Sequence, residues 1–381
     1  MKTLIRIGWD YMSSHSGGAS TPPDLVSDGD ASVSAGPAGG SPTSFRQRER
    51  QPTIRDVASL AQVSLPTVSR VLTGAVPVRE ATRKRVLEAM RELGYRPNGA
   101  ARALVQGQQP IVGVITRDTT RHGYARMLLN IEARAKLHGY LVAITVVDPE
   151  EFDTAGGALD VLLAQPIVGV VVLDYHTYDP VKLQRRLGSI PIATVIHGGE
   201  SPVDVAHVLV DDYEAARETT RHLLSLGHQT VHHIAVPGQQ ANQGSHARER
   251  GWREALEAAG APVPAVQRTD WSIASGVAAG AALAADPTVT AVFCSNDELA
   301  FATMRSMHEA GRQVPADVSV AGLDDEPLAS IWVPSLTTYR LDFDWAGQAA
   351  LELLIDPAEG AQRAGNPRSG LVVRESTRPP R

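Results

Sequence analysis

The feature that most limits how this chain can fold is a regular alternation of apolar runs and helical patterns that begins at Ile111. The runs at 111–116 and 167–173 consist mainly of Ile and Val, as in strands that are buried on both faces of a sheet. Helical patterns at 125–138 and 213–226 are each followed by a glycine, which commonly ends a helix. This succession predicts doubly wound parallel sheets covered by helices, and its length of roughly 270 residues suffices for two such lobes. Ligands of such sheets bind at the carboxyl ends of the strands. Further strands are predicted at 141–147, 192–196, within 228–236, and at 263–267, 291–294 and 318–322, with further helices at 155–164, 246–259, 275–284 and 298–309.

A second pattern, at 53–72, reads as two short helices joined by a tight turn. Thr53 and Asp56 have the spacing of a capping box. Ser64 can cap the second helix, and Pro66 falls in its first turn, where a missing N–H costs nothing. The outward face of this second helix carries Leu65, Pro66, Thr67, Ser69 and Arg70. This is the form of a helix-turn-helix whose second helix enters a DNA major groove, and the alternative is a small helical hairpin with a solvated face.

A third helix is predicted at 79–93, where Val86, Ala89, Met90 and Leu93 recur at helical spacing. It would supply the core that two short helices lack.

The charge of the chain is unevenly distributed. Residues 46–106 carry twelve Lys or Arg against five acids, a local charge of +7, whereas the whole chain has −6, so the remainder holds −13. A basic module joined to an acidic body is typical of a DNA-binding domain attached to a second domain.

Residues 13–45 are rich in Ser, Gly, Pro, Ala and Asp and are expected to be disordered.

The cysteine count and the apolar runs indicate an intracellular protein. Cys294 is the only cysteine, so no intrachain disulfide can form. No apolar run approaches the ~20 residues that span a membrane, and residues 1–8 are too short and too interrupted for a secretory signal. The expected location is the cytoplasm.

Taken together, these segments resemble the lac repressor (LacI/GalR) family of transcriptional regulators over about residues 52–378. The headpiece motifs are Thr53-Ile-Arg-Asp-Val-Ala, Thr67-Val-Ser-Arg-Val-Leu, Leu93-Gly-Tyr-Arg-Pro-Asn98 and Ala101-Arg-Ala-Leu104. The body motifs are Leu226-Gly-His228, Arg250-Gly-Trp252, Asn296-Asp297, Gly322-Leu-Asp-Asp325 and Leu336-Thr-Thr338. The contexts Asp270-Trp-Ser272 and Leu341-Asp-Phe343 look closest to the lac repressor branch.

The resemblance implies a domain order. After the extension at 1–50, which its composition marks as disordered, come a helix-turn-helix domain at 51–97, a hinge helix and linker at 98–109, and an effector-binding and dimerisation domain at 110–381 that is similar to periplasmic binding proteins. Lobe 1 would hold about 110–210 and 342–368, and lobe 2 about 211–341 and 369–381.

The resemblance also implies a homodimer on a pseudo-palindromic operator. Leu65, Pro66 and Arg70 occupy base-reading positions, and the fork of Arg70 fits the two acceptors of a guanine. Pro66 departs from the polar reader of many members and offers only apolar contact. Phosphate contacts are implied for Thr53, Ser64, Thr67, Ser69 and Asn98, and Leu104 matches the leucine that wedges into the minor groove.

For the effector domain, the resemblance implies a site between the two lobes. Trp271 and Phe343 match positions that contact a sugar ring, whereas Arg248, Asn296 and Asp324 match positions that bind hydroxyls. His197 lies near a position that is often Asp, and Arg121 and Tyr124 would line the cleft. The structural alternatives are that Arg248 pairs with a surface acid, that Trp271 is plain core, and that Asp297 caps the helix after it.

These features predict a repressor of carbohydrate-utilisation genes that a mono- or disaccharide releases from its operator. The alternatives are a regulator that responds to a purine or another metabolite, and a sugar-binding transport component. No metal site, cofactor or catalytic group is expected, because no phosphate loop, nucleophile elbow or convincing catalytic pair is present. No heptad-bearing helix follows the body, so a dimer is expected rather than a coiled-coil tetramer.

Overall fold

The computed structural model describes residues 52–73, 77–95, 110–148, 152, 154, 156–173, 178–198, 205–236, 245–365 and 367–381. The predicted extension at 1–50 and the hinge at 98–109, with Asn98 and Leu104, lie outside these residues. The chain divides into two compact units, Met1–Arg96 and Pro97–Arg381.

The first unit is a three-helix headpiece made of α1 (Ile54–Leu60), α2 (Leu65–Thr73) and α3 (Glu80–Glu92). One residue from each helix, Val57, Val68 and Val86, is fully buried in a shared core. The turn between α1 and α2 places Gln62 at a positive φ of 54°. The predicted helices and their packing residues are therefore present in the structure.

The capping of α1 also follows the sequence prediction in part. The Asp56 carboxylate accepts hydrogen bonds from the backbone amide of Thr53 at 2.6 Å and from its hydroxyl at 2.7 Å. At the start of α2, the hydroxyls of Ser64 and Thr67 lie 2.9 Å apart, and Pro66 occupies the first turn. These local contacts fix the starts of α1 and α2, and α2 carries the outward face.

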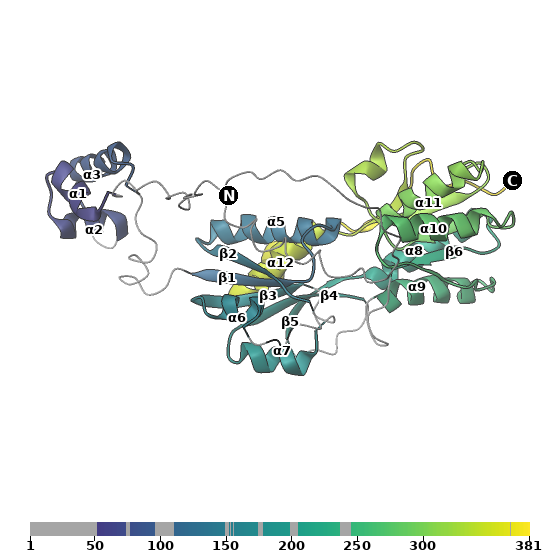
Figure 1. Cartoon of the computed structure of the whole chain (residues 1–381), viewed down its shortest axis with the longest axis horizontal. Helices are drawn as coiled ribbons and strands as arrows, with labels where there is room; N and C mark the ends of the chain where they lie inside the picture. Colours follow the sequence, from purple (N-terminus) through teal and green to yellow (C-terminus); the bar gives the residue numbers. More distant parts are fainter. Residues whose placement is uncertain are drawn as a thin grey trace, which may run out of the picture. The chain divides into compact units, whose positions relative to one another are not determined.

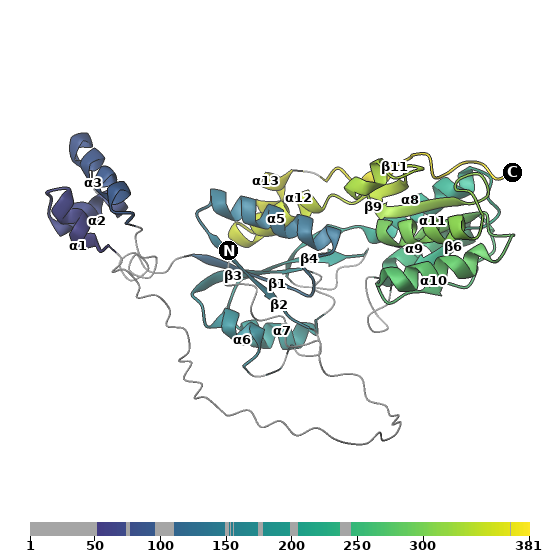
Figure 2. The ribbon, with the colours of Figure 1, turned by 45° about the horizontal axis from the view of Figure 1, so that its top comes forward.

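In the second unit, the first lobe is a fully parallel sheet with the strand order β2-β1-β3-β4-β5. The strands are β1 (Ile111–Thr116), β2 (Leu141–Val146), β3 (Ile167–Leu173), β4 (Ile192–His197) and β5 (Ala206–Val210). The helices are α5 (His122–Leu137), α6 (Ala158–Leu163), α7 (Pro180–Leu187), α12 (Phe343–Ile355) and α13 (Gly360–Ala364). Figures 1 and 2 show α5 and α12 on one face of this sheet and α6 and α7 on the other. Each face has its own buried cluster, as a doubly wound sheet requires.

The second lobe is a sheet with the order β11-β10-β9-β8-β6-β7. Its strands are β6 (His232–Ala235), β7 (Gln267–Arg268), β8 (Ala291–Cys294), β9 (Ser319–Asp324), β10 (Thr337–Arg340) and β11 (Gly370–Val372). The helices are α8 (Asp212–Ser225), α9 (Ser245–Ala258), α10 (Ile273–Ala284), α11 (Asp297–Glu309) and the short 3-10 helix η3 (Pro327–Ser330). Phe293 faces the cluster that contains α8 and α9, whereas its neighbours Val292 and Cys294 face the cluster that contains α10 and α11.

Trp252 anchors α9 to the second sheet. Its side chain is fully buried, and its indole Nε1 donates a hydrogen bond to the Val231 carbonyl at 2.8 Å. The His233 ring stacks on Trp252 with centroids 5.2 Å apart and on Phe293 with centroids 4.9 Å apart. Burial lowers the pKa of His233 to about 4, so this ring is a neutral part of the core at pH 7.

The chain passes between the two lobes at Asp211, again at Leu341–Asp342, and finally between α13 and β11. The last passage brings in β11, which pairs antiparallel with β10. The sheet is thus parallel, as expected, except at this edge, where the sequence pattern had not predicted the strand β11. An antiparallel pairing is possible there because the chain enters from the other lobe rather than through a crossover helix of its own sheet.

Among the described residues, no helix is long and apolar enough to cross a membrane.

Candidate effector cavity

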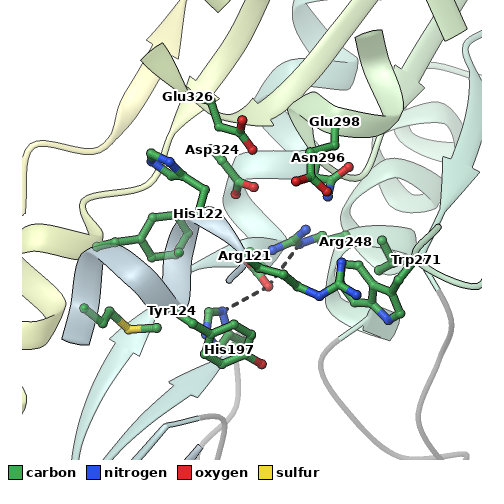
Figure 3. Close-up of a pocket in the computed structure, with 15 residues that line it drawn as sticks. Arg121, His122, Tyr124, His197, Arg248, Trp271, Asn296, Glu298, Asp324 and Glu326 are labelled. Atoms are coloured by element: carbon green, nitrogen blue, oxygen red, sulfur yellow. Dashed lines mark hydrogen bonds and ion pairs between the residues drawn. The ribbon is translucent and has the colours of Figure 1, made fainter. Parts of the chain in front are cut away.

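A cavity opens at the carboxyl ends of the strands of both lobes. The empty space within and in front of it, open solvent included, is about 710 Å³. All eight residues that the sequence nominated for effector binding line it: Arg121, Tyr124, His197, Arg248, Trp271, Asn296, Asp324 and Phe343. The lining also includes His122, Gly123, Met127, Asp212, Val236, Glu298 and Glu326. Figure 3 shows these side chains gathered around the opening.

A buried ion pair forms the floor of the cavity. The Arg248 Nε lies 3.1 Å from Asp212 Oδ2, and its Nη2 donates to Asp212 Oδ1 at 3.2 Å. Arg248 Nη1 also donates to the Ser295 carbonyl, and His197 Nδ1 lies 3.4 Å from Asp212 Oδ2 (dashed lines in Figure 3 mark contacts among the cavity residues). Burial alone would raise the pKa of Asp212, but the charges of Arg248 and then His197 outweigh it and lower that pKa to about 2. Arg248 therefore pairs with an acid, as the structural alternative supposed, but that acid is buried in the cavity.

One wall of the cavity is the indole ring of Trp271, with the guanidinium group of Arg121 over its face. Arg121 Cζ lies 4.2 Å from the ring centroid of Trp271, and Arg121 Nε pairs with Asp118 Oδ2 at 3.1 Å. Arg121 precedes α5 in the first lobe, whereas Trp271 precedes α10 in the second, so this contact joins the lobes. Trp271 has a φ of 73°, a conformation that bulky residues rarely adopt and that clusters at functional sites.

Another part of the lining is centred on Phe343, which is 4% exposed. The rings of His122 and His197 lie 6.2 and 6.5 Å from its centroid. A Cβ on Gly123 would come within 2.8 Å of the Phe343 ring, so the backbone of α5 approaches this ring closely. The first turn of α5 and the start of α12 thus fix the position of Phe343 together.

Asn296 and its neighbours define the polar end. The Asn296 side-chain oxygen caps α11 by accepting from the Leu299 amide at 2.9 Å, which leaves its NH₂ group available to a ligand. The suggestion that Asp297 caps this helix was wrong. The buried Asp297 carboxylate instead accepts from the Thr338 hydroxyl at 2.6 Å and the Glu326 amide at 2.8 Å.

Asp324 completes this end at the last position of β9, with a φ of 118°. Its Oδ1 is shielded from solvent and has no hydrogen-bond partner among the described residues. Burial raises the pKa of Asp324 well above its ordinary value, although the charge of Arg248 opposes the rise. A shielded, unpaired carboxyl oxygen in a cavity is a group that a ligand hydroxyl or amine can satisfy.

The nominated DNA-binding residues fall into two groups in the headpiece. Leu65, Pro66 and Arg70 are exposed on α2, as a reading face requires. Thr53, Thr67 and Ser69 are partly buried, and Ser64 is exposed. Their side chains lie at helix starts or along α2, near the backbone amides that commonly contact phosphates.

Sequence reasoning missed several cavity residues, of which Asp212 is the most consequential. Acids are common in the first turn of a helix, where they stabilise the positive end of the helix dipole. The position of Asp212 in the sequence therefore did not indicate a role in the cavity. Glu298 and Glu326 were also missed. Each stands within two residues of a nominated position, Asn296 or Asp324, and this proximity was the available signal.

Comparisons with known proteins give the same assignment. The model of "Bacterial regulatory proteins, lacI family" matches residues 53–98, and that of "Periplasmic binding protein-like domain" matches 220–377. The chain is 31% identical to the lactose operon repressor of Escherichia coli (strain K12) over 333 residues, covering 86% of this chain and 91% of the repressor. It is 33% identical to the HTH-type transcriptional regulator CelR of Thermobifida fusca over 327 residues, covering 82% and 94%.

Solved structures agree. The chain resembles the lac repressor dimer bound to operator and the anti-inducer ONPF, with a TM-score of 0.73, 29% identity, and coverage of 86% of this chain and 100% of that chain. It also resembles the CelR–cellobiose complex, with a TM-score of 0.60, 30% identity, and coverage of 85% and 99%. The expected fold class, a helix-turn-helix domain joined to a periplasmic-binding-protein-like domain, is confirmed. The chain therefore belongs to the lacI family of bacterial regulatory proteins and is a DNA-binding transcriptional regulator.

Proposed function

We propose that this regulator represses carbohydrate-utilisation genes and that a mono- or disaccharide binds in the cavity to release it from its operator. The observation that carries the proposal is the convergence of the eight nominated residues on one cavity. Aromatic groups for the C–H face of a sugar ring stand there beside Arg248, Asn296 and Asp324, which suit hydroxyls. The regulator acts as a homodimer, with one headpiece on each half-site, and catalyses no reaction.

The domain limits belong to the same proposal. Lobe 1 comprises about 110–210 and 342–368, and lobe 2 about 211–341 and 369–381. Membership of β1 to β5 in one sheet and of β6 to β11 in the other supports this division. Because the cavity takes residues from both lobes, a sugar bound there stabilises one lobe arrangement over another. Release then requires tighter binding to the DNA-free state, by a coupling of typically about 1–3 kcal/mol.

The test is a titration of operator binding by the full-length protein against a panel of mono- and disaccharides. We expect at least one saccharide to weaken operator binding by about 5- to 150-fold. A response to purines or phosphorylated metabolites, with none to carbohydrates, would show that the effector class is wrong. Deleting residues 1–109 should abolish operator binding and preserve saccharide affinity, which separates a regulator from a transport component.

Arg70 is the residue we expect to dominate base recognition. Arg70→Ala should weaken operator binding by about 1–3 kcal/mol and relax specificity at a single base pair, because a bidentate contact with guanine is lost. Binding to single-base operator variants measures both effects. Arg91→Ala removes an exposed arginine of α3 outside the reading face; it is the matched control and should leave the relative affinities for the operator variants unchanged. A uniform loss for Arg70→Ala would assign Arg70 to phosphate contact instead.

Arg121 covers the ring of Trp271 on which a sugar would stack. Arg121→Ala should therefore tighten saccharide binding about 2- to 5-fold, since a cation–π contact of about 0.5–1 kcal/mol no longer competes for the ring. Saccharide titrations followed by tryptophan fluorescence measure this change. Weaker binding by the variant would mean that Arg121 itself contacts the effector.

A further inference from the structure

The charges around the cavity are not balanced, and this imbalance bears on which carbohydrate it takes. Both arginines of the lining are already matched by acids: Arg248 by Asp212, and Arg121 by Asp118. Three other carboxylates, Asp324, Glu298 and Glu326, belong to the lining, and no ion pair among the described residues includes them. Figure 3 shows all three on one side of the cavity, next to Asn296.

The neighbouring residues do not neutralise these acids. His122 lies on the same side in Figure 3, but burial, and then the charge of Arg126, lower its pKa, so it is uncharged at pH 7. Burial, and then the charge of Glu298, raise the pKa of Glu326 to about 7. The charges of Asp297 and Glu326 act in the same direction on Asp324. Each ionised carboxylate therefore opposes the ionisation of the others.

We propose that the effector is a carbohydrate that carries a positively charged amino group, held by Asp324, Glu298 and Glu326 at the polar end of the cavity. An ammonium group has three N–H donors and one positive charge. It satisfies the shielded Oδ1 of Asp324, and its charge favours the ionised forms of the three acids, which burial and their mutual repulsion oppose. A neutral hydroxyl supplies only the hydrogen bond, and an anionic sugar adds to the repulsion. This inference rests on the proposed function, namely that the cavity takes a carbohydrate.

The experiment measures dissociation constants by titration calorimetry with the full-length protein at pH 7. The probes are matched pairs, glucosamine with glucose and galactosamine with galactose, together with the two N-acetylated amino sugars. We expect an amino sugar to bind about tenfold more tightly than its neutral partner and its acetylated form, because one additional charge pair forms at partial burial.

Variants assign the preference to these carboxylates. In the Glu298→Gln/Glu326→Gln double variant, we expect the amino and neutral sugars to bind within about threefold of each other, since most of the unpaired negative charge is gone. Glu309→Gln is the matched control: it lies on α11 with Glu298 but is exposed and pairs with Arg305. It should preserve the preference.

The remaining outcomes separate this inference from the proposed function. If a neutral sugar binds as tightly as its amino partner or more tightly, the effector does not need an ammonium group, but the proposed carbohydrate regulator stands. The same conclusion follows if only neutral saccharides weaken operator binding in the titration panel. A preference for amino sugars that survives in the double variant overturns the role of Glu298 and Glu326. If no carbohydrate of either kind binds, the proposed function fails as well.

Discussion

Replacing Arg248 by methionine is expected to lower the free energy of unfolding of the effector domain by about 3–5 kcal/mol and to abolish the response to effector. The side chains of Arg248 and Asp212 are 9% and 4% exposed, so the variant leaves a carboxylate in the interior without its main cation. The same change removes a donor from the floor of the cavity. Chemical denaturation of the full-length protein and operator titrations measure the two effects.

The double variant Asp212→Asn/Arg248→Met provides the control. Because it removes both charges, it should be more stable than Arg248→Met alone, while its effector response stays lost. If the double variant is as unstable as the sum of the two single variants, the two charges are not coupled.

The two proteins should also respond differently to acid. In the wild type, the pKa of Asp212 is lowered from its ordinary 3.8 to about 2, so its stabilising contribution is present at neutral pH and is lost as the pH falls through that window. In Arg248→Met, burial is opposed only by His197, and the pKa of Asp212 should rise. The variant should then recover part of its stability between pH 7 and pH 4, whereas the wild type gains nothing from this group.

Trp252→Ala should have an effect of similar size, about 3–5 kcal/mol, through packing rather than charge. The indole is fully buried between α9 and the second sheet and stacks on His233. Its removal leaves a cavity that the surrounding strands cannot fill. The midpoint of urea denaturation measures the loss.

Trp252→Phe separates the ring from its hydrogen bond. Phenylalanine keeps most of the stacking but leaves the Val231 carbonyl without its donor, so a loss of about 1–3 kcal/mol is expected. Equal losses for the two variants would mean that the hydrogen bond, and not the volume of the indole, dominates.

The sequence predicted the central strands best. The bounds of β1 and β3 agree residue for residue with the expected 111–116 and 167–173, because each apolar run is preceded by a proline and followed by a charged residue, which leaves few alternatives. The edge strand β5 was missed, since His207 and Leu209 are exposed and its five residues carry no continuous apolar run. The helix α12 was missed although Ala346, Ala349 and Leu353 recur at helical spacing after the cap Asp342, so that signal was present in the chain.

Sequence motifs predicted which residues line the cavity, but only the structure shows which side chains those residues contact. The fold determines that Arg248 meets Asp212, 36 residues away, and that Arg121 lies over Trp271. Asp212 and Arg248 lie on different helices of the second lobe, and Arg121 and Trp271 lie on different lobes, so no local spacing rule connects either pair. The phosphate contact of Asn98 and the minor-groove wedge of Leu104 fall in the hinge segment, outside the described residues, and remain predictions.

The segments that connect the two lobes constrain how the ligand preference of such a regulator can evolve. Asp212 follows the first passage by one residue, and Phe343 follows the second directly, so two lining residues sit on the segments whose backbone torsions must absorb any movement of one lobe against the other. A substitution that reshapes the cavity at these positions also shifts the resting balance between lobe arrangements. A substitution there would therefore change two properties at once: which ligand binds, and the effector concentration at which the regulator leaves its operator. Adaptation to a new ligand would then require a second substitution elsewhere in the chain to restore that concentration.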